Sequence, residues 1–270
     1  MKTQACLLLT LTLATTAFAA DTSAPWSYEG NTGPADWGKL SPAYAACAEG
    51  KTQTPINIQD PLSKNPVTAV IHYEPLPLAI INDGDTELKI GSQQVVTNTG
   101  HGVQINYHGD EARESLTYQG TVYHLVQFHF HAPAETKWNG FQYPLEIHFV
   151  NESDDGKVAV LAVFVAADNG NVTLQNIIDH LPKEAKKETV LNEVELNIKN
   201  LLPMHATLGS FMGSLTTPPC TEGLQWLVYQ HPITASTLQI QTLAKAMGHA
   251  NARPLQALNG RVVESVSAAF

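Results

Sequence analysis

Short runs of β-branched and aromatic residues dominate the middle of the chain, and each run is bounded by Gly, Asn, Asp or Pro. This pattern predicts strands, because such side chains fit a pleated, half-buried surface. The run Val158–Val165 is almost wholly apolar, so we expect a central strand covered on both faces. The predicted strands are Ala69–Tyr73, Leu88–Ile90, Val103–Tyr107, Val122–His131, Leu145–Val150, Val158–Val165 and Leu224–Tyr229.

Two segments carry helical signals instead. The first helix is expected to end before Pro182, and its apolar positions follow the spacing i, i+3, i+4, i+7. These positions are Leu174, Ile177, Ile178 and Leu181. The second is expected to begin at a Thr234 cap and to stop at Gly248. The patterns together predict a large central sheet with a few peripheral helices.

The composition fits a single folded domain. We find no internal repeat, no low-complexity tract and no long linker in the 270 residues. Hydrophobic residues make up 43% and charged residues only 15%, which argues against disorder. The formal net charge is −10 and basic residues form no cluster, so nucleic acid is not an expected partner.

The first residues have the three parts of a secretory signal. Lys2 is followed by the apolar run Cys6–Leu13 and by the small-residue segment Ala17–Ala19. We expect cleavage after Ala19, which makes residues 1–19 a signal peptide and 20–270 the mature domain. The alternative is a membrane anchor, but the run is short and rich in Thr. The expected location is periplasmic or secreted, with no membrane anchor after cleavage.

Two cysteines remain after the signal, Cys47 and Cys220. In an oxidising compartment an isolated pair indicates one disulfide. Two buried free thiols are the alternative. The export signal favours the bridge.

The segment Leu125–His131 contains the strongest chemical signal. Side chains alternate across a strand, so polar and apolar residues here separate onto two faces. One face is expected to carry Leu125, Gln127, His129 and His131. The other is expected to carry Val126, Phe128 and Phe130. Residues two apart on one face have Cα atoms roughly 7 Å apart, so both imidazoles can reach one ion.

A second strand repeats this logic, with Glu146, His148 and Val150 on one face. If it lies beside the first, His148 supplies a third ligand. Three neutral imidazoles with one open position are typical of catalytic zinc, although copper also suits such a set. Gln127 and Glu146 each lie two residues before a histidine and can accept its free N–H.

From these residues outward, almost the whole mature chain resembles the α-class carbonic anhydrases, and most closely their exported bacterial members. No single motif is decisive, but the ordered set is specific. The matching segments are Trp26–Tyr28, Gly33–Trp37, Gln53–Ile58, Asn98–His101, Gln127–His131, Glu146–His148, Gly213–Cys220, Trp226 and Asn251–Pro254.

The resemblance implies a mainly β (α+β) single domain around a twisted, mainly antiparallel sheet of about ten strands. It implies zinc-dependent, reversible hydration of carbon dioxide to bicarbonate and a proton. Zinc (Zn²⁺) would be bound by His129, His131 and His148. Gln127, Glu146 and the Asn251 carbonyl would hold these histidines in place. Cis peptide bonds at Thr54-Pro55 and Pro218-Pro219 are also implied.

Further roles follow from the same resemblance. Thr216 would donate to Glu135 and orient the attacking hydroxide, and Thr217 would contact bicarbonate. His101 would be the proton shuttle. The apolar pocket for carbon dioxide would be formed by Val150, Val160 and Leu215. The residues that organise the shuttle's water would be Tyr28, Asn98 and Gln104.

Three positions depart from the family pattern. Ala134 and Thr136 flank Glu135 where other residue types are usual, which affects the expected network around Glu135 and Glu146. Thr99 replaces an Asn near the shuttle. Two other functions are compatible with such a fold: a binding module that keeps the fold and loses zinc histidines, and a zinc hydrolase of activated esters. The intact histidine set disfavours the first. The sequence leaves a homodimer open.

Overall fold

The computed structural model describes residues 24–60, 62–73, 75–90, 93–106, 114–181, 187–204 and 207–270, with backbone alone for 75–90, 93–101 and 187–195. The expected signal peptide, residues 1–19, and Tyr107 therefore lie outside the described residues. The strands of this part are β1 (Asn57–Ile58), β2 (Ser63–His72), β3 (Pro75–Ile90), β4 (Gln93–Asn106), β5 (Ser115–Tyr118), β6 (Thr121–His131), β7 (Lys137–Trp138), β8 (Leu145–Glu152), β9 (Val158–Ala167), β10 (Lys187–Asn197), β11 (Thr207–Ser214), β12 (Glu222–Tyr229), β13 (Ile233–Ala235) and β14 (Glu264–Ala269).

One large sheet contains all these strands except β1 and β7, which pair with each other. The order β10-β3-β4-β6-β5-β2-β14-β11-β12-β9-β13 is joined by β8, which pairs with both β6 and β9. Most neighbours are antiparallel, whereas β14–β2, β12–β9 and β13–β9 are parallel. The expected fold class, mainly β around a central and mainly antiparallel sheet, is confirmed.

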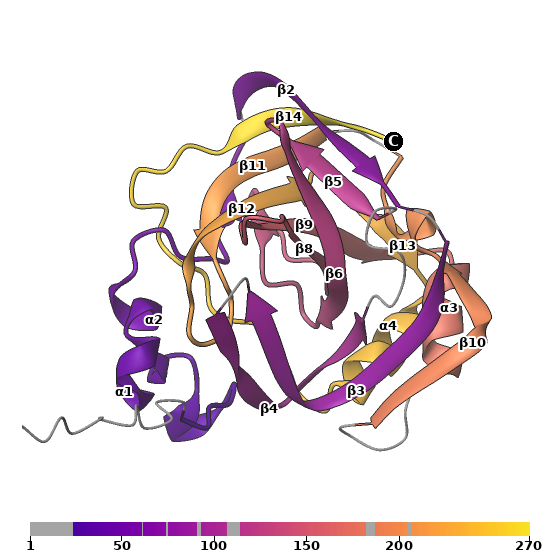
Figure 1. Ribbon diagram of the computed structural model, residues 1–270, viewed down its shortest axis with the longest axis horizontal. Helices are drawn as coiled ribbons and strands as arrows, with labels where there is room; N and C mark the ends of the chain where they lie inside the picture. The colour runs from indigo at the N-terminus through magenta and orange to yellow at the C-terminus, as the bar shows by residue number, and fades with distance from the viewer. Residues whose placement is uncertain are drawn as a thin grey trace, which may run out of the picture.

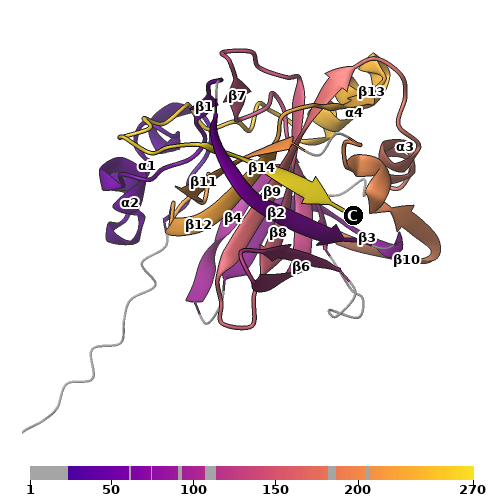
Figure 2. The ribbon, with the colours of Figure 1, turned by 90° about the horizontal axis from the view of Figure 1, so that it is seen from above.

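The helices are short and lie around the sheet. Figures 1 and 2 both show α1 and α2 at one end of the molecule and α3 with α4 at the other, with the sheet between them. The helical segments of the described residues are η1 (Gly30–Thr32), α1 (Trp37–Leu40), η2 (Pro42–Tyr44), α2 (Ala46–Glu49), α3 (Val172–Asp179), η3 (Ile198–Leu201) and α4 (Thr237–Ala246). No helix among them is long and apolar enough to cross a membrane.

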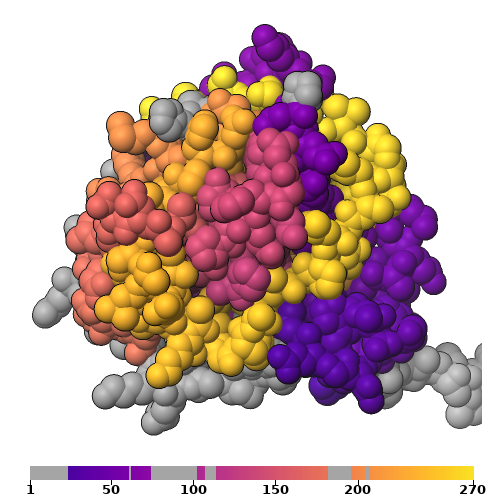
Figure 3. Space-filling view, turned by 180° about the vertical axis from the view of Figure 1, so that it is seen from behind, coloured from indigo at the N-terminus to yellow at the C-terminus, as the bar shows by residue number. Residues whose placement is uncertain are grey.

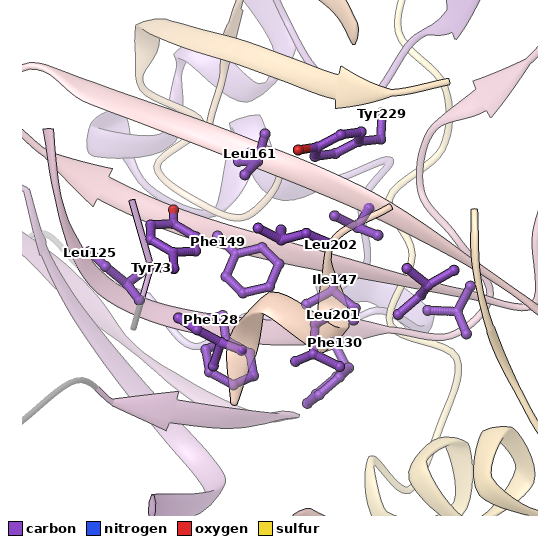
Figure 4. Packing of buried hydrophobic residues seen from close by; sticks show 14 of the residues in the cluster. Tyr73, Leu125, Phe128, Phe130, Ile147, Phe149, Leu161, Leu201, Leu202 and Tyr229 are labelled. Atoms are coloured by element: carbon purple, nitrogen blue, oxygen red, sulfur yellow. The ribbon is translucent and has the colours of Figure 1, made fainter. Parts of the chain in front are cut away.

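The central strand β9 is covered on both faces, as its apolar sequence predicts. Leu161 and its alternate neighbours enter the larger core cluster, whereas Val160 and Phe164 enter a second cluster on the opposite face. In Figure 4 the rings of Phe128 and Phe149 lie together in the larger cluster, with centroids 5.1 Å apart. The sheet therefore separates a predominantly hydrophobic core on one face from a second face that also carries polar groups.

The face assigned to Leu125 and Val126 from the sequence is wrong. Leu125 is buried in the larger core beside Phe128, and Val126 is 36% exposed. The cause is a β-bulge, because Leu125 pairs with Asn151 while Gln127 pairs with the adjacent Val150. The extra residue changes which side chains face the core along β6. Beyond the bulge, the predicted alternation holds.

The expected cap of the last helix is also wrong. Thr234 lies in β13, and Ser236 is the N-cap of α4. The Ser236 hydroxyl accepts from Gln239 N, while the Gln239 side chain accepts from Ser236 N. This reciprocal capping box satisfies two N–H groups that the helix leaves open. Gly248, with φ of +79°, follows the helix as predicted.

The N-terminal region is held to the rest by aromatic packing and by a disulfide. Trp26, Trp37 and Tyr44 form a buried cluster with Cys220, which is bonded to Cys47 as predicted. The bridge spans 173 residues of sequence. The peptide bonds Thr54-Pro55 and Pro218-Pro219 are cis as expected, and so is Ala132-Pro133.

Reduction of this bridge should lower the free energy of unfolding by up to about 5 kcal/mol, because the reduced unfolded chain regains the entropy of a very long loop. Urea unfolding with and without dithiothreitol measures the change. A Cys47→Ser/Cys220→Ser variant should be insensitive to the reductant. Mass mapping that finds two free thiols in unreduced protein would contradict the bridge.

Candidate active site

The register of β6 and β8 brings the histidines together. His129 pairs directly with His148, and His131 pairs with Glu146. Directly opposed residues of an antiparallel pair point to the same face with Cβ atoms about 5 Å apart. Because His131 is two residues beyond His129, it lies on that face as well. The three predicted ligands are thus neighbours for a simple geometric reason.

The three side chains converge on one point. One ligand atom from each of His129, His131 and His148 lies within 4.8 Å of the other two. The ring centroids of His131 and His148 are 4.5 Å apart. His131 and His148 are nearly fully buried, whereas His129 is only partly buried. The group is therefore open toward solvent on the His129 side.

Each histidine is held by a polar neighbour on its other ring nitrogen. His129 Nδ1 lies 2.8 Å from Gln127 Oε1, and His131 Nδ1 lies 2.7 Å from the Asn251 carbonyl. His148 Nε2 lies 3.1 Å from Glu146 Oε1, although neither atom makes a hydrogen bond with the described residues. These contacts leave His129 Nε2, His131 Nε2 and His148 Nδ1 to face one another. Such partners fix ring orientation and tautomer.

The surroundings favour neutral imidazoles. Burial holds the pKa of His129 and of His148 well below the usual value, and repulsion from His131 adds to this effect. Burial also lowers the pKa of His131, against its contact with Asn251. Neutral imidazole is the form that binds a metal ion. The group is therefore ready to act as a ligand set at neutral pH.

Glu135 lies behind the histidines in a fully buried position. Its Oε1 accepts a hydrogen bond of 2.8 Å from Arg253 N, and its Oε2 lies 3.5 Å from His131 Nε2. Burial raises the pKa of Glu135, while the Arg253 N–H and the Thr216 hydroxyl lower it. Thr216, 6% exposed, thus adjoins this carboxylate. This neighbour was expected from the family resemblance alone.

Thr216 and Thr217 lie in the turn between β11 and β12. Thr217 O accepts from Cys220 N at 2.8 Å, and Leu215 N donates to Thr221 O at 2.9 Å. A Cβ added to Gly213 would collide with the Thr54 and Trp226 side chains, so only glycine fits where the turn begins. Close packing and the Cys220 bridge therefore fix the turn that carries both threonines.

A row of apolar side chains, called the apolar wall below, lies beside the three histidines. Val150 pairs with Val160, and Val160 pairs with Trp226, so three apolar side chains form a row across β8, β9 and β12. Leu215 belongs to the same buried cluster. Trp226 meets His148 edge-on at 5.0 Å between ring centroids. The residues expected to form an apolar pocket are thus brought together beside the histidines.

For the remaining expected site residues, the structure describes some side-chain contacts and, in two cases, only the position on a strand. Gln104 on β4 pairs with His129 and donates to Asn106 Oδ1 at 2.7 Å. Tyr28 is close enough to Glu135 for the carboxylate to raise the pKa of the phenol, after the larger effect of burial. Asn98 and His101 lie on β4, and their side chains lie outside the described part.

The departures at Ala134 and Thr136 leave the network around Glu146 connected. Thr136 N donates to Glu146 Oε2 at 2.8 Å, a backbone contact that any residue type can make. Ala134 is fully buried in the second core cluster. The carboxylate of Glu146 is therefore oriented without the usual side chains.

Two residues of the site were given no role from the sequence. Trp226 was noted as an apolar position of a predicted strand and as a match to the family, but without a role. Arg253 is 3% exposed and contacts Glu135, yet nothing in a loop segment marks a buried arginine. Such a position depends on contacts between distant segments, so local patterns do not reveal it.

Comparison with known proteins gives a consistent picture. The family model for eukaryotic-type carbonic anhydrase matches residues 32–267. A carbonic anhydrase of Pectobacterium carotovorum is 40% identical over 264 residues, covering 97% of this chain and 99% of that protein. The alpha-carbonic anhydrase of Thermovibrio ammonificans, solved with the inhibitor sulfanilamide, is 34% identical with a TM-score of 0.78, covering 90% of this chain and 99% of that chain. The Photobacterium profundum enzyme is 37% identical with a TM-score of 0.75, covering 88% and 99%.

Fold and site together define a mainly β enzyme with a three-histidine group that can hold a metal ion. The chain belongs to the eukaryotic-type, or alpha, carbonic anhydrase family. Members of this family are lyases that interconvert carbon dioxide and bicarbonate, and this chain is such an enzyme.

Replacing Asn251 tests how the loop holds the site. Its Oδ1 accepts from Ala132 N at 2.8 Å, and its Nδ2 donates to Phe130 O at 2.9 Å. Asn251→Ala leaves both buried groups unpaired, so the free energy of unfolding should fall by about 2–5 kcal/mol. Urea denaturation measures this loss.

Gln256→Ala is the matched control, because among the described hydrogen bonds the Gln256 side chain makes an exposed, local one alone, from Nε2 to Pro254 O. Its stability should stay within about 0.5 kcal/mol of the unchanged protein. Equal stability of both variants would show that the Asn251 side chain does not secure the loop.

Proposed function

We propose that the enzyme hydrates carbon dioxide reversibly to bicarbonate and a proton, using zinc held by His129, His131 and His148. The convergence of three ligand atoms within 4.8 Å carries this proposal. His131 Nε2 is buried and has no hydrogen-bond partner among the described residues, which is costly unless an ion occupies that direction. The donor set fits zinc with one open position.

When bound, zinc lowers the pKa of water and so supplies the nucleophile near neutral pH, chemistry for which carbonic anhydrases are the reference case. The chain's own contribution is to hold the ligands. Gln127 and Asn251 each fix one histidine ring by a hydrogen bond, and Glu146 lies beside the third, so the imidazoles need little reorganisation.

The apolar wall provides the binding place for carbon dioxide. The side chains of Val150, Val160 and Leu215 bind water poorly, so water competes little with a linear, nonpolar substrate at this surface. Because Val150 lies on the same strand face as His148, the substrate is held beside the metal ligands. Trp226 closes this wall next to His148.

Glu135 and Thr216 orient the attacking oxygen. A Thr216 hydroxyl that donates its proton to Glu135 can only accept from its other neighbour, so that neighbour must carry a proton. The lone pair of the attacking oxygen then points toward the apolar wall. Thr217, on the same turn, contacts the bicarbonate that forms.

Proton removal is assigned to His101. A histidine titrates near neutral pH and can pass a proton to buffer. The position of its neighbour on β4 supports this assignment, since a Cβ added at Gly102 would lie 3.9 Å from Nδ2 of Asn251, whose carbonyl contacts His131. Tyr28, Asn98 and Gln104 supply polar groups for the connecting water.

We also propose that residues 1–19 direct export to the periplasm or medium and that 20–270 form the catalytic domain. The Cys47–Cys220 disulfide supports an oxidising location. A binding module of the same fold is the second candidate. It is disfavoured, because the three histidines, Glu135 and Thr216 are all present and adjacent.

His148→Ala should lose most bound zinc and nearly all hydration activity. Replacing a neighbour of a metal ligand costs up to about 100-fold in affinity, so loss of a ligand should cost more. Metal analysis and stopped-flow hydration of the purified mature protein measure both quantities.

His180→Ala serves as the control, since His180 contacts only the local Asn176 carbonyl in the described hydrogen bonds. It should retain zinc and rate. Full zinc content and full rate in His148→Ala would show that the ligand assignment is incorrect.

His101→Ala should lower kcat strongly in dilute buffer and leave kcat/KM nearly unchanged, because attack on carbon dioxide does not use the shuttle. Added imidazole buffer should restore much of the lost turnover, since a free base replaces the missing side chain. Stopped-flow assays at several imidazole concentrations measure this rescue.

The same assay on His72→Ala, an exposed histidine of β2, gives the control. A defect of His101→Ala that ignores imidazole, or wild-type kcat in dilute buffer, would refute the shuttle and leave the zinc assignment intact.

A further inference from the structure

Two arginines bind the backbone of residues 47–54 from the C-terminal part of the chain. Arg253 donates to Thr54 O at 2.8 Å and to Cys47 O at 3.1 Å. Arg261 donates to Gln53 O at 2.7 Å. On the surface in Figure 3, indigo N-terminal and yellow C-terminal parts lie side by side. Both arginines therefore hold this segment in place through hydrogen bonds to its carbonyl groups.

The guanidinium of Arg253 has a second restraint that is aromatic. Its central carbon lies 5.7 Å from the centroid of Trp37, whose side chain is fully buried. A desolvated cation over an indole face is held more firmly than an exposed one. Trp37 is itself fixed by a 2.8 Å hydrogen bond to Ser27 O. The Arg253 side chain therefore has one well-defined place.

Arg253 also reaches the site, which Arg261 does not do in any described contact. Its main-chain N–H binds Glu135 Oε1 at 2.8 Å, and Glu135 is the acid that acts most strongly on its charge. Burial lowers the pKa of Arg253 to about 10, so the side chain stays cationic at neutral pH. A buried cation needs a nearby negative group.

The segment that anchors Arg253 also anchors the turn that carries Thr216. Thr54 N donates to Ser214 Oγ at 3.0 Å, and Ser214 N donates to Thr54 Oγ1 at 3.0 Å. Gln53 Nε2 donates to Cys220 O at 3.0 Å. Residues 53–54 thus contact the turn that carries Thr216. Through Thr54 O they also contact the side chain of Arg253, whose main-chain N–H binds Glu135.

We propose that Arg253 is a positioning residue that fixes the Glu135 carboxylate relative to Thr216. Its guanidinium anchors the loop whose main-chain N–H binds Glu135. The inference rests on the proposed roles of Glu135 and Thr216, and it adds an element outside the set of metal ligands.

The test compares Arg253→Gln and Arg253→Lys with Arg261→Gln in the zinc-loaded, full mature protein. Arg261 is the matched control, because its guanidinium also binds carbonyls, those of Gln53, Met212, Ala257 and Leu258. Zinc content, kcat/KM, kcat in dilute buffer and crystal structures are measured for each variant.

Arg253→Gln should keep its zinc and lose about ten- to a hundredfold in kcat/KM, because small misplacements in a site are costly. Its kcat in dilute buffer should fall much less, since proton transfer limits turnover there. Arg253→Lys keeps the charge but cannot make both guanidinium hydrogen bonds, so its kcat/KM should lie between those of Arg253→Gln and the unchanged enzyme. In crystals, the Glu135 carboxylate should turn from Thr216 in Arg253→Gln and stay in Arg261→Gln.

Equal kcat/KM in Arg253→Gln and Arg261→Gln would overturn the proposal, as would a proportional fall of kcat and kcat/KM, which reports lost folded enzyme. If Arg253→Gln does not fold, Arg253→Lys decides, and wild-type kcat/KM in that variant overturns the proposal. A wild-type enzyme without zinc-dependent hydration would instead refute the proposed function.

Discussion

His129 and His148 lie directly opposite each other on β6 and β8, and the rest of the site depends on this register. A slip of one residue would turn His148 and Glu146 toward the apolar core and bring Ile147 and Phe149 to the polar face. The core contacts of Phe128 and Phe149 oppose such a slip, because their rings pack together in the larger hydrophobic cluster. Hydrophobic burial on one face therefore fixes polar chemistry on the other.

The bulge at Val126 allows β6 both to bury apolar side chains along its whole length and to present Gln127, His129 and His131 on the opposite face. Tyr123 and Leu125 face the core before the bulge, whereas Phe128 and Phe130 face it afterwards. Without the extra residue, either Leu125 or the Gln127–His129–His131 side would point the wrong way. The change in apolar phase is visible in the sequence, but an extra residue can be placed only when the partner strand is known.

Local sequence patterns predicted β9, the polar face of β6 and the helix that ends before Pro182, because each depends on a short periodic run. They did not predict Ser236 as the cap, since Thr234 and Ser236 are both acceptable cap residues and only the path of β13 separates them. The family resemblance supplied Thr216 and Asn251, which look like ordinary loop residues. Arg253 lies in the matching segment Asn251–Pro254 but was given no role, since its contacts join segments about 200 residues apart.

The central claim is that the three imidazoles together bind one zinc ion. X-ray absorption at the zinc edge of the loaded enzyme measures this ligand set directly. If the three histidines hold the metal, the spectrum should show three imidazole nitrogens about 2.0–2.1 Å from zinc and one further light atom. Sulfur in the shell, or fewer than three imidazoles, would contradict it.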